Sequence, residues 1–152
     1  MRKILGIAIC LLAITSCSPK VEPVAHGGSV NLIQEMQDKS TIVVRSLGYG
    51  KNIAIAQEDA ELRAIKAVLF SGFSTDHPAM LVESRVMKNN AAAMNDFFVS
   101  KAYKDCILHI EKVGSLRKEK GHKVKKMPCD ITINTNSLRQ KLRQKRLFKM
   151  GF

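Results

Sequence analysis

The 152-residue sequence predicts one α+β domain, built from a small and mainly antiparallel sheet with two to three helices packed on it. A β-branched run at residues 41–47 is followed by a helical pattern of small residues. Two segments of alternating apolar residues, 106–116 and 123–134, flank a short polar turn and predict an antiparallel pair. Residues 17–152 are enough for one core and not for two.

The strand predicted at residues 41–47 ends at Gly48-Tyr49-Gly50, after which Asn52 is placed to cap a helix reaching about Phe70. A stripe of small residues at helical spacing predicts that this helix approaches the sheet closely, and Gly72 is a natural C-cap. The stripe consists of Ala56, Ala60, Ala64 and Ala67, and the polar side of the helix carries Glu58, Glu61 and Lys66. Lys51 completes a Gly-Tyr-Gly-Lys turn that superficially suggests phosphate binding, but its spacing matches no phosphate-binding fingerprint, so we interpret it as a strand-to-helix turn.

The intervening segments give weaker signals. Residues 30–36 are expected to form a short helical turn and residues 73–78 a loop. Residues 79–87 fit either a strand or an extended connector. A second helix is predicted to start at Asn90 and run to about residue 102, with Met94, Phe97 and Phe98 as its apolar side.

The pair at 106–116 and 123–134 is expected to place its apolar residues on one inward face. Those residues are Cys106, Leu108 and Ile110 on the first strand and Met127, Cys129, Ile131 and Ile133 on the second. Pro128 cannot donate a hydrogen bond, which predicts an edge strand or a bulge there. Residues 135–137 are then expected to cap a last basic helix at 138–147.

The N-terminal segment has the layout of an export signal. Arg2 and Lys3 precede an apolar run at residues 4–14, which is shorter than the roughly 20 residues of a membrane-spanning helix. The run leads through small residues into Cys17 and so resembles the lipobox of bacterial lipoproteins. This resemblance implies removal of residues 1–16 and lipidation of Cys17, and Ser18 favours sorting to the outer membrane. An ordinary secretory signal is the alternative.

These features divide the chain into a signal peptide at 1–16, a lipidated cysteine with a flexible linker at 17–29, and a domain at 30–152. Positive charge gathers at the end of that domain: residues 17–111 carry ten basic and eleven acidic side chains, whereas 112–152 carry thirteen basic and two acidic ones. Export makes nucleic acid an unsuitable partner. An envelope protein, an anionic envelope polymer or lipid head groups fit better as partners. The alternative is that the basic residues form a solvent-exposed face that binds no partner and aids solubility.

The candidate anion-binding residues lie on the last helix and are Arg139, Lys141, Arg143, Lys145, Arg146 and Lys149. Two arrangements fit the leucines of this helix. It could lie on a membrane surface, or it could pack its leucines on the sheet and show its charges to solvent, which is the interpretation we favour.

The cysteines left after processing, Cys106 and Cys129, are candidates for a disulfide, with two buried free thiols as the alternative. A zinc site formed by these cysteines with His109 and His122 is disfavoured, because residues three apart on a strand point to opposite faces. We therefore expect no metal and no cofactor. No nucleophile–histidine motif indicates an enzyme.

The stretches GYGKNIAIAQEDAELRAIKAVLFSGF and CDITINTNSLRQKLRQKRLFKMGF resemble small envelope lipoproteins of Bacteroidetes-type bacteria and, more weakly, the N-terminal α/β domain of flagellar assembly protein T and related lipoproteins. The resemblance implies a non-catalytic part of an envelope assembly, anchored through lipid on Cys17 and facing the periplasm. A secretion-system lipoprotein, such as one of type VI, and a periplasmic ligand-binding protein or envelope enzyme with an unidentified cleft are the alternatives.

Overall fold

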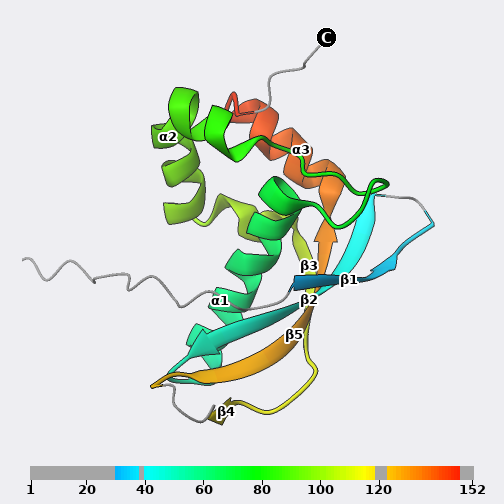
Figure 1. Cartoon of the computed structure of the whole chain (residues 1–152), viewed down its shortest axis with the longest axis vertical. Coiled ribbons are helices and arrows are strands. Elements are labelled where there is room, and N and C mark those ends of the chain that lie inside the picture. The colour runs from blue at the N-terminus through cyan, green and yellow to red at the C-terminus, as the bar shows by residue number, and fades with distance from the viewer. Residues whose placement is uncertain (1–29, 38–39, 119–122, 148–152) are drawn as a thin grey trace, which may run out of the picture.

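The computed structural model describes residues 30–37, 40–118 and 123–147. Within them an antiparallel sheet has the strand order β1-β2-β5-β3, with β4 pairing on β5, and helices cover one face (Figure 1). This architecture confirms the predicted α+β class. The leader, the linker with Cys17, His122 and Lys149 lie outside the described residues.

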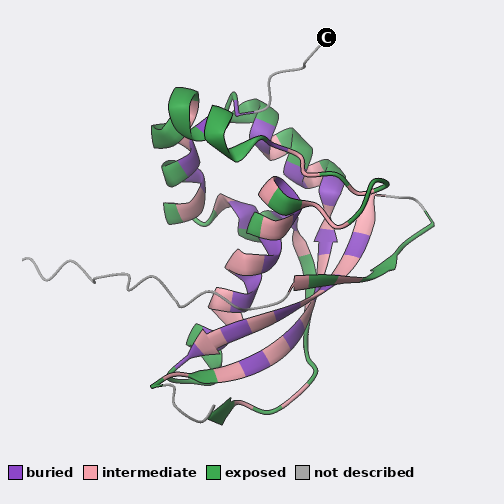
Figure 2. Ribbon diagram, in the orientation of Figure 1, coloured by how far each residue is buried: buried purple, intermediate pink, exposed green. Residues whose placement is uncertain are grey.

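The centre of the sheet is a long pair formed by β2 (Thr41–Gly50) and β5 (Lys125–Asn134). Their register runs without interruption from Thr41↔Asn134 to Gly50↔Lys125. Buried and half-buried residues alternate along both strands, as Figure 2 shows, because successive side chains point to opposite faces. The inward face predicted for the second strand is confirmed, and its members are Met127, Cys129, Ile131 and Ile133.

Helix α1 (Ile53–Lys66) lies on this inward face. The Asn52 side chain caps it as predicted, accepting a hydrogen bond from the Ile55 amide at 2.9 Å. The alanine stripe lets the helix approach the sheet so closely that a Cβ on Gly48 would lie 1.8 Å from the Ala56 carbonyl oxygen. The chain continues as a π-helix, η1 (Ala67–Ser71), which ends at Gly72 with φ of 65°.

Two weak predictions were wrong. Residues 30–36 do not form a helical turn: β1 (Val30–Glu35) pairs with β2 at the edge of the sheet, and Val30 and Leu32 pack against the core. Helix α2 (Glu83–Val99) begins before Asn90, which is a kink with φ of −142° inside it. The added first half of α2 contributes the buried Val86 to the core.

The position of β5 also differs from the prediction, because this strand is central although it contains Pro128. The Pro128 carbonyl accepts a hydrogen bond from the Val113 amide at 3.1 Å. In an extended strand the backbone nitrogen and the carbonyl of one residue point to the same side. The Pro128 nitrogen, which has no hydrogen to donate, therefore faces the segment between β3 (Ile107–Lys112) and β4 (Arg117–Lys118) and not β2. The proline therefore breaks no bond between β5 and β2.

The face predicted for the strand before the turn was wrong at Leu108. A bulge between Ile107 and His109 shifts the β3 register, and Leu108 is left 59% exposed instead of facing inward. Ile107 packs against the core in its place, while Cys106 and Ile110 meet the core as predicted.

The remaining helices close the core at one end of the sheet (Figure 1). The 3₁₀-helix η2 (Ala102–Cys106) buries Tyr103 beside Phe97 and Phe98. Helix α3 (Thr135–Gln144) follows β5 directly, and its N-cap is Asn134, whose side chain accepts from the Ser137 amide at 2.8 Å.

Candidate anion-binding surface

Helix α3 packs on the domain; it begins and ends three residues before the predicted helix at 138–147, so it carries Arg139, Lys141 and Arg143, while Lys145 and Arg146 directly follow it. Leu138 and Leu142 are fully buried, which fits the favoured arrangement in which the helix shows its charges to solvent. Two of those charges have carboxylate partners: Lys141 lies 2.6 Å from Asp105, and Lys145 lies 2.6 Å from Asp96. The hydrogen bond to Asp105 raises the pKa of Lys141. The acidic neighbours thus reduce the excess charge on α3.

The other α3 cations differ in their surroundings. Arg139 is exposed and donates a long hydrogen bond of 3.4 Å to the Asn136 side chain. Arg143 and Arg146 are also exposed. Because α3 presents a mixture of paired and exposed charges, it is a weaker anion-binding surface than its sequence predicts.

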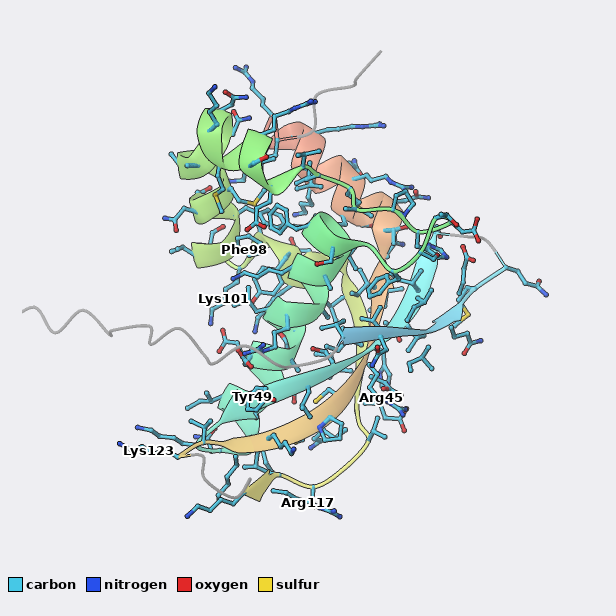
Figure 3. All side chains as sticks on the ribbon, in the orientation of Figure 1. Arg45, Tyr49, Phe98, Lys101, Arg117 and Lys123 are labelled. Carbon is cyan, nitrogen blue, oxygen red and sulfur yellow. The ribbon has the colours of Figure 1, made fainter. Side chains whose placement is uncertain are left out.

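A denser group of cations lies at the opposite end of the molecule, where β2 turns into α1 and where β4 pairs with β5. We call this the basic end. The register places Gly50, Lys125 and Lys118 side by side across three strands, and Lys126 next to Arg117. Figure 3 labels two cations of this end, Arg117 and Lys123. Its basic residues are Lys51, Arg117, Lys118, Lys123, Lys125 and Lys126, and all but the half-buried Lys126 are exposed.

The segments that form the basic end, residues 48–55, 113–118 and 123–128, contain no carboxylate. Among the nearest acidic residues along α1, Glu58 pairs with Lys101 and Asp59 with Arg63, and Asp59 also accepts a hydrogen bond from the Tyr49 amide of the basic end. Glu119 lies outside the described residues. The exposed cations of the basic end therefore add to one another within the described part of the chain, and their potential extends over roughly 10 Å at ordinary ionic strength.

Apolar side chains accompany these cations. Ile53 and Ile55, in the first turn of α1, are 49% and 48% exposed. Ile55 lies next to the paired Gly50 and Lys125, since a Cβ on Gly50 would be 2.9 Å from the Ile55 Cγ2 atom. The basic end is consequently amphipathic as well as positively charged.

The uncovered face of the sheet carries a shallow hollow of about 360 Å³ beside the basic end. Arg117 and Lys126 supply its positive charge, while Leu47 and Pro128 supply apolar contacts. Further along the same face Arg45 forms a bidentate pair with Asp130, with both distances 2.7 Å, so the positive surface ends there.

The Gly-Tyr-Gly-Lys turn belongs to this end, and packing accounts for its glycines. Side-chain atoms at Gly48 or Gly50 would meet the α1 backbone, with Cβ distances of 1.8 Å to the Ala56 oxygen and 2.5 Å to the Ala56 nitrogen, respectively. The side chain of Asn52 already accepts from the first turn of the helix. The geometry supports the interpretation of a strand-to-helix turn.

Cys106 and Cys129 are both buried and both free, so the disulfide considered from the sequence is not formed in this structure. The predicted pairing of the two strands is correct, but the register places Lys112 opposite Cys129. Cys106 precedes β3, six residues from Lys112, which corresponds to roughly 15–20 Å along an extended chain. A disulfide requires Cα atoms within about 7 Å.

Burial raises the pKa of both thiols above its ordinary value. Across the parts of the chain that the structure describes, no three histidine, cysteine or acidic side chains gather as metal ligands, and His122 of the considered zinc set lies outside them.

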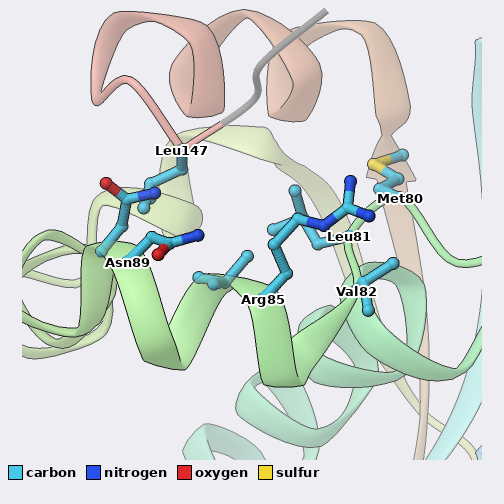
Figure 4. A pocket seen from close by; sticks show the side chains of 8 residues that line it. Met80, Leu81, Val82, Arg85, Asn89 and Leu147 are labelled. Carbon is cyan, nitrogen blue, oxygen red and sulfur yellow. The ribbon is translucent and has the colours of Figure 1, made fainter. Parts of the chain in front are cut away.

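A pocket of about 150 Å³ lies between α2 and the end of α3, as Figure 4 shows. Its walls are apolar apart from Arg85 and two asparagines, Asn89 and Asn90. Ligand sites for small molecules usually measure about 300–1,000 Å³. This pocket is therefore a weaker candidate than the basic end. It is lined by Met80, Leu81, Val82, Arg85, Val86, Asn89, Asn90 and Leu147.

In the part of the chain with a described structure, every helix is too short or too polar to cross a membrane. Comparison of the chain with protein-family models, with curated proteins and with solved structures finds no match. The geometry alone thus defines the candidate surface. Sequence reasoning counted the basic-end cations other than Lys51 in the charge of residues 112–152 but singled out only the basic residues of the last helix, and it missed Ile53 and Ile55. The signal was the run of basic residues on both sides of the turn at 118–121.

Proposed function

We propose that this protein is a lipoprotein of the bacterial envelope, anchored through lipid on Cys17 to the outer membrane and facing the periplasm. Its α+β domain acts without catalysis, as an accessory component that binds an anionic partner. The lipobox-like sequence that ends at Cys17 supports the anchoring. The resemblance to small envelope lipoproteins supports the accessory role.

The basic end is the observation that carries the binding part of this proposal. Exposed cations on three neighbouring described segments, which contain no carboxylate of their own, attract a multiply charged anion together. In contrast, Lys141 on α3 and Lys145 just after it already have aspartate partners. We therefore assign the main contact to the basic end and a secondary one to α3.

Matched charge reversals test this assignment. The full chain, solubilised in a neutral detergent, is loaded on a phosphate-bearing resin and eluted with salt. The variants Lys123→Glu/Lys125→Glu and Arg139→Glu/Arg143→Glu change the net charge by the same amount. We expect the basic-end variant to elute at distinctly lower salt than the α3 variant, because clustered charges contribute together. Equal shifts would mean that only net charge matters.

Fractionation of cells tests the anchoring. Cys17→Ala removes the residue that would be acylated, so the variant should leave the membrane fraction or remain unprocessed, whereas a Cys106→Ala control should fractionate like the unmodified protein. Normal processing and membrane retention of Cys17→Ala would contradict a lipidated cysteine. Crosslinking in the envelope separates the other readings, since a stoichiometric protein partner would favour a secretion-type assembly and a bound small molecule would favour a ligand-binding protein.

A further inference from the structure

The basic end combines cations with exposed isoleucines on one projecting part of the fold. Figure 1 shows the ends of β2 and β5, together with β4, extending away from α2 and α3. Lys51 lies two residues before the first turn of α1, where Ile53 and Ile55 are about half exposed, and Ile55 adjoins the pair Gly50↔Lys125. A partner that fits this surface offers negative charge and an apolar layer together.

We propose that the basic end is a membrane-contact surface, on which lysines bind the phosphates of anionic phospholipids while Ile53 and Ile55 insert between the head groups. This inference rests on the proposed function, because it identifies the anionic partner of the same surface. An anionic polymer pairs with the lysines but leaves the isoleucines in water. A phospholipid surface pairs with the lysines and also buries the isoleucines, as it does for interfacial segments that place basic residues beside apolar ones.

The tether has the length that this contact needs. The register pairs Val30, the first described residue, with Ser46, four residues before Gly50. At about 3.4 Å per residue, the basic end lies roughly 14 Å along β2 from this point. The chain takes thirteen residue-to-residue steps from Cys17 to Val30, which span at most about 45 Å. A domain held by Cys17 can therefore bring its basic end to the membrane that holds the lipid.

Tryptophan fluorescence tests the contact directly, because the chain contains no tryptophan. The variants Ile53→Trp and Ile55→Trp place a single reporter on the basic end, and Leu108→Trp places one on β3, where Leu108 is 59% exposed. Each full-length variant is reconstituted into phosphatidylcholine vesicles with or without phosphatidylglycerol, and some vesicles carry brominated acyl chains. All variants share the same membrane attachment, so any difference between them reports on the surface alone.

We expect anionic vesicles to shift the emission of Trp variants at Ile53 and Ile55 to the blue, and brominated chains to quench it. The Leu108→Trp control should change in neither respect, and Lys123→Glu/Lys125→Glu should reduce the shift at Ile55. Emission at the basic end that matches the control would overturn the inference. So would an equal blue shift in detergent with soluble polyglutamate, which would assign the surface to an acidic polymer. The N-terminal mass of the same samples reports separately on lipidation at Cys17.

Discussion

Replacing Gly48 with alanine tests the close approach of α1 to the sheet. The added Cβ would lie 1.8 Å from the Ala56 oxygen and 2.8 Å from the Ala60 Cβ. Even a very tight contact of 3.0 Å requires the helix backbone to move by about 1.2 Å, which is the difference between these distances. A gap of only about 0.5–1 Å already removes a quarter to a half of the dispersion energy between packed atoms, so this displacement weakens the whole packed face.

We therefore expect Gly48→Ala to lower the free energy of unfolding by about 3 kcal/mol, the upper end of what overpacking usually costs. With a denaturant dependence of about 2 kcal/mol per M, the urea midpoint should fall by about 1.5 M. Circular dichroism at increasing urea measures this midpoint. Gly114→Ala is the matched control, since its Cβ would lie 3.1 Å from a Pro128 side-chain atom, and it should change the midpoint little. A Gly48→Ala midpoint indistinguishable from that control would refute the packing argument.

Three further predictions concern buried groups. Burial, and to a smaller extent the carboxylate of Glu61, raises the pKa of Tyr103 to about 12. Because the unfolded chain loses this proton near pH 10, the stability of the protein should fall as the pH rises between these two values. Urea midpoints measured over that range should fall less for Tyr103→Phe than for the unmodified protein. The buried Ser46 hydroxyl has no hydrogen-bond partner among the described residues, so Ser46→Ala should be neutral or stabilising by up to about 1 kcal/mol. A clear loss of stability would reveal a hydrogen bond at this hydroxyl. Cys106 and Cys129 are buried free thiols with raised pKa values, so both should react with a thiol reagent only after unfolding, and a non-reducing mass showing a bridge would contradict this.

Most of the sheet and its covering helix were predictable because their signals are local. The alanine stripe and Asn52 define α1, and the alternation in residues 127–133 defines the inward face of β5. Glu61 was expected on the solvent side of this helix but is only 4% exposed, because η2 packs there and Lys104 pairs with it at 3.2 Å. No local pattern reports that contact.

The wrong predictions share a physical cause, which is that tertiary contacts decided the local structure. β1 is an edge strand whose alternation is weak, since only Val30 and Leu32 meet the core. The start of α2 has no side-chain cap at Val82, so the sequence gives no start signal there. The register between β3 and β5, which pairs Lys112 with Cys129, separates Cys106 from Cys129. The basic end combines three segments, and only the strand register brings them together.

The mass of the N-terminal peptide, taken from protein purified out of bacterial membranes, tests the central claim most directly. The account predicts a peptide that begins at Cys17 and carries the added mass of several acyl chains on its sulfur and amino groups. Cys17→Ala should abolish that peptide. A peptide that begins at Met1, or at another residue without acyl mass, would contradict a lipid-anchored protein.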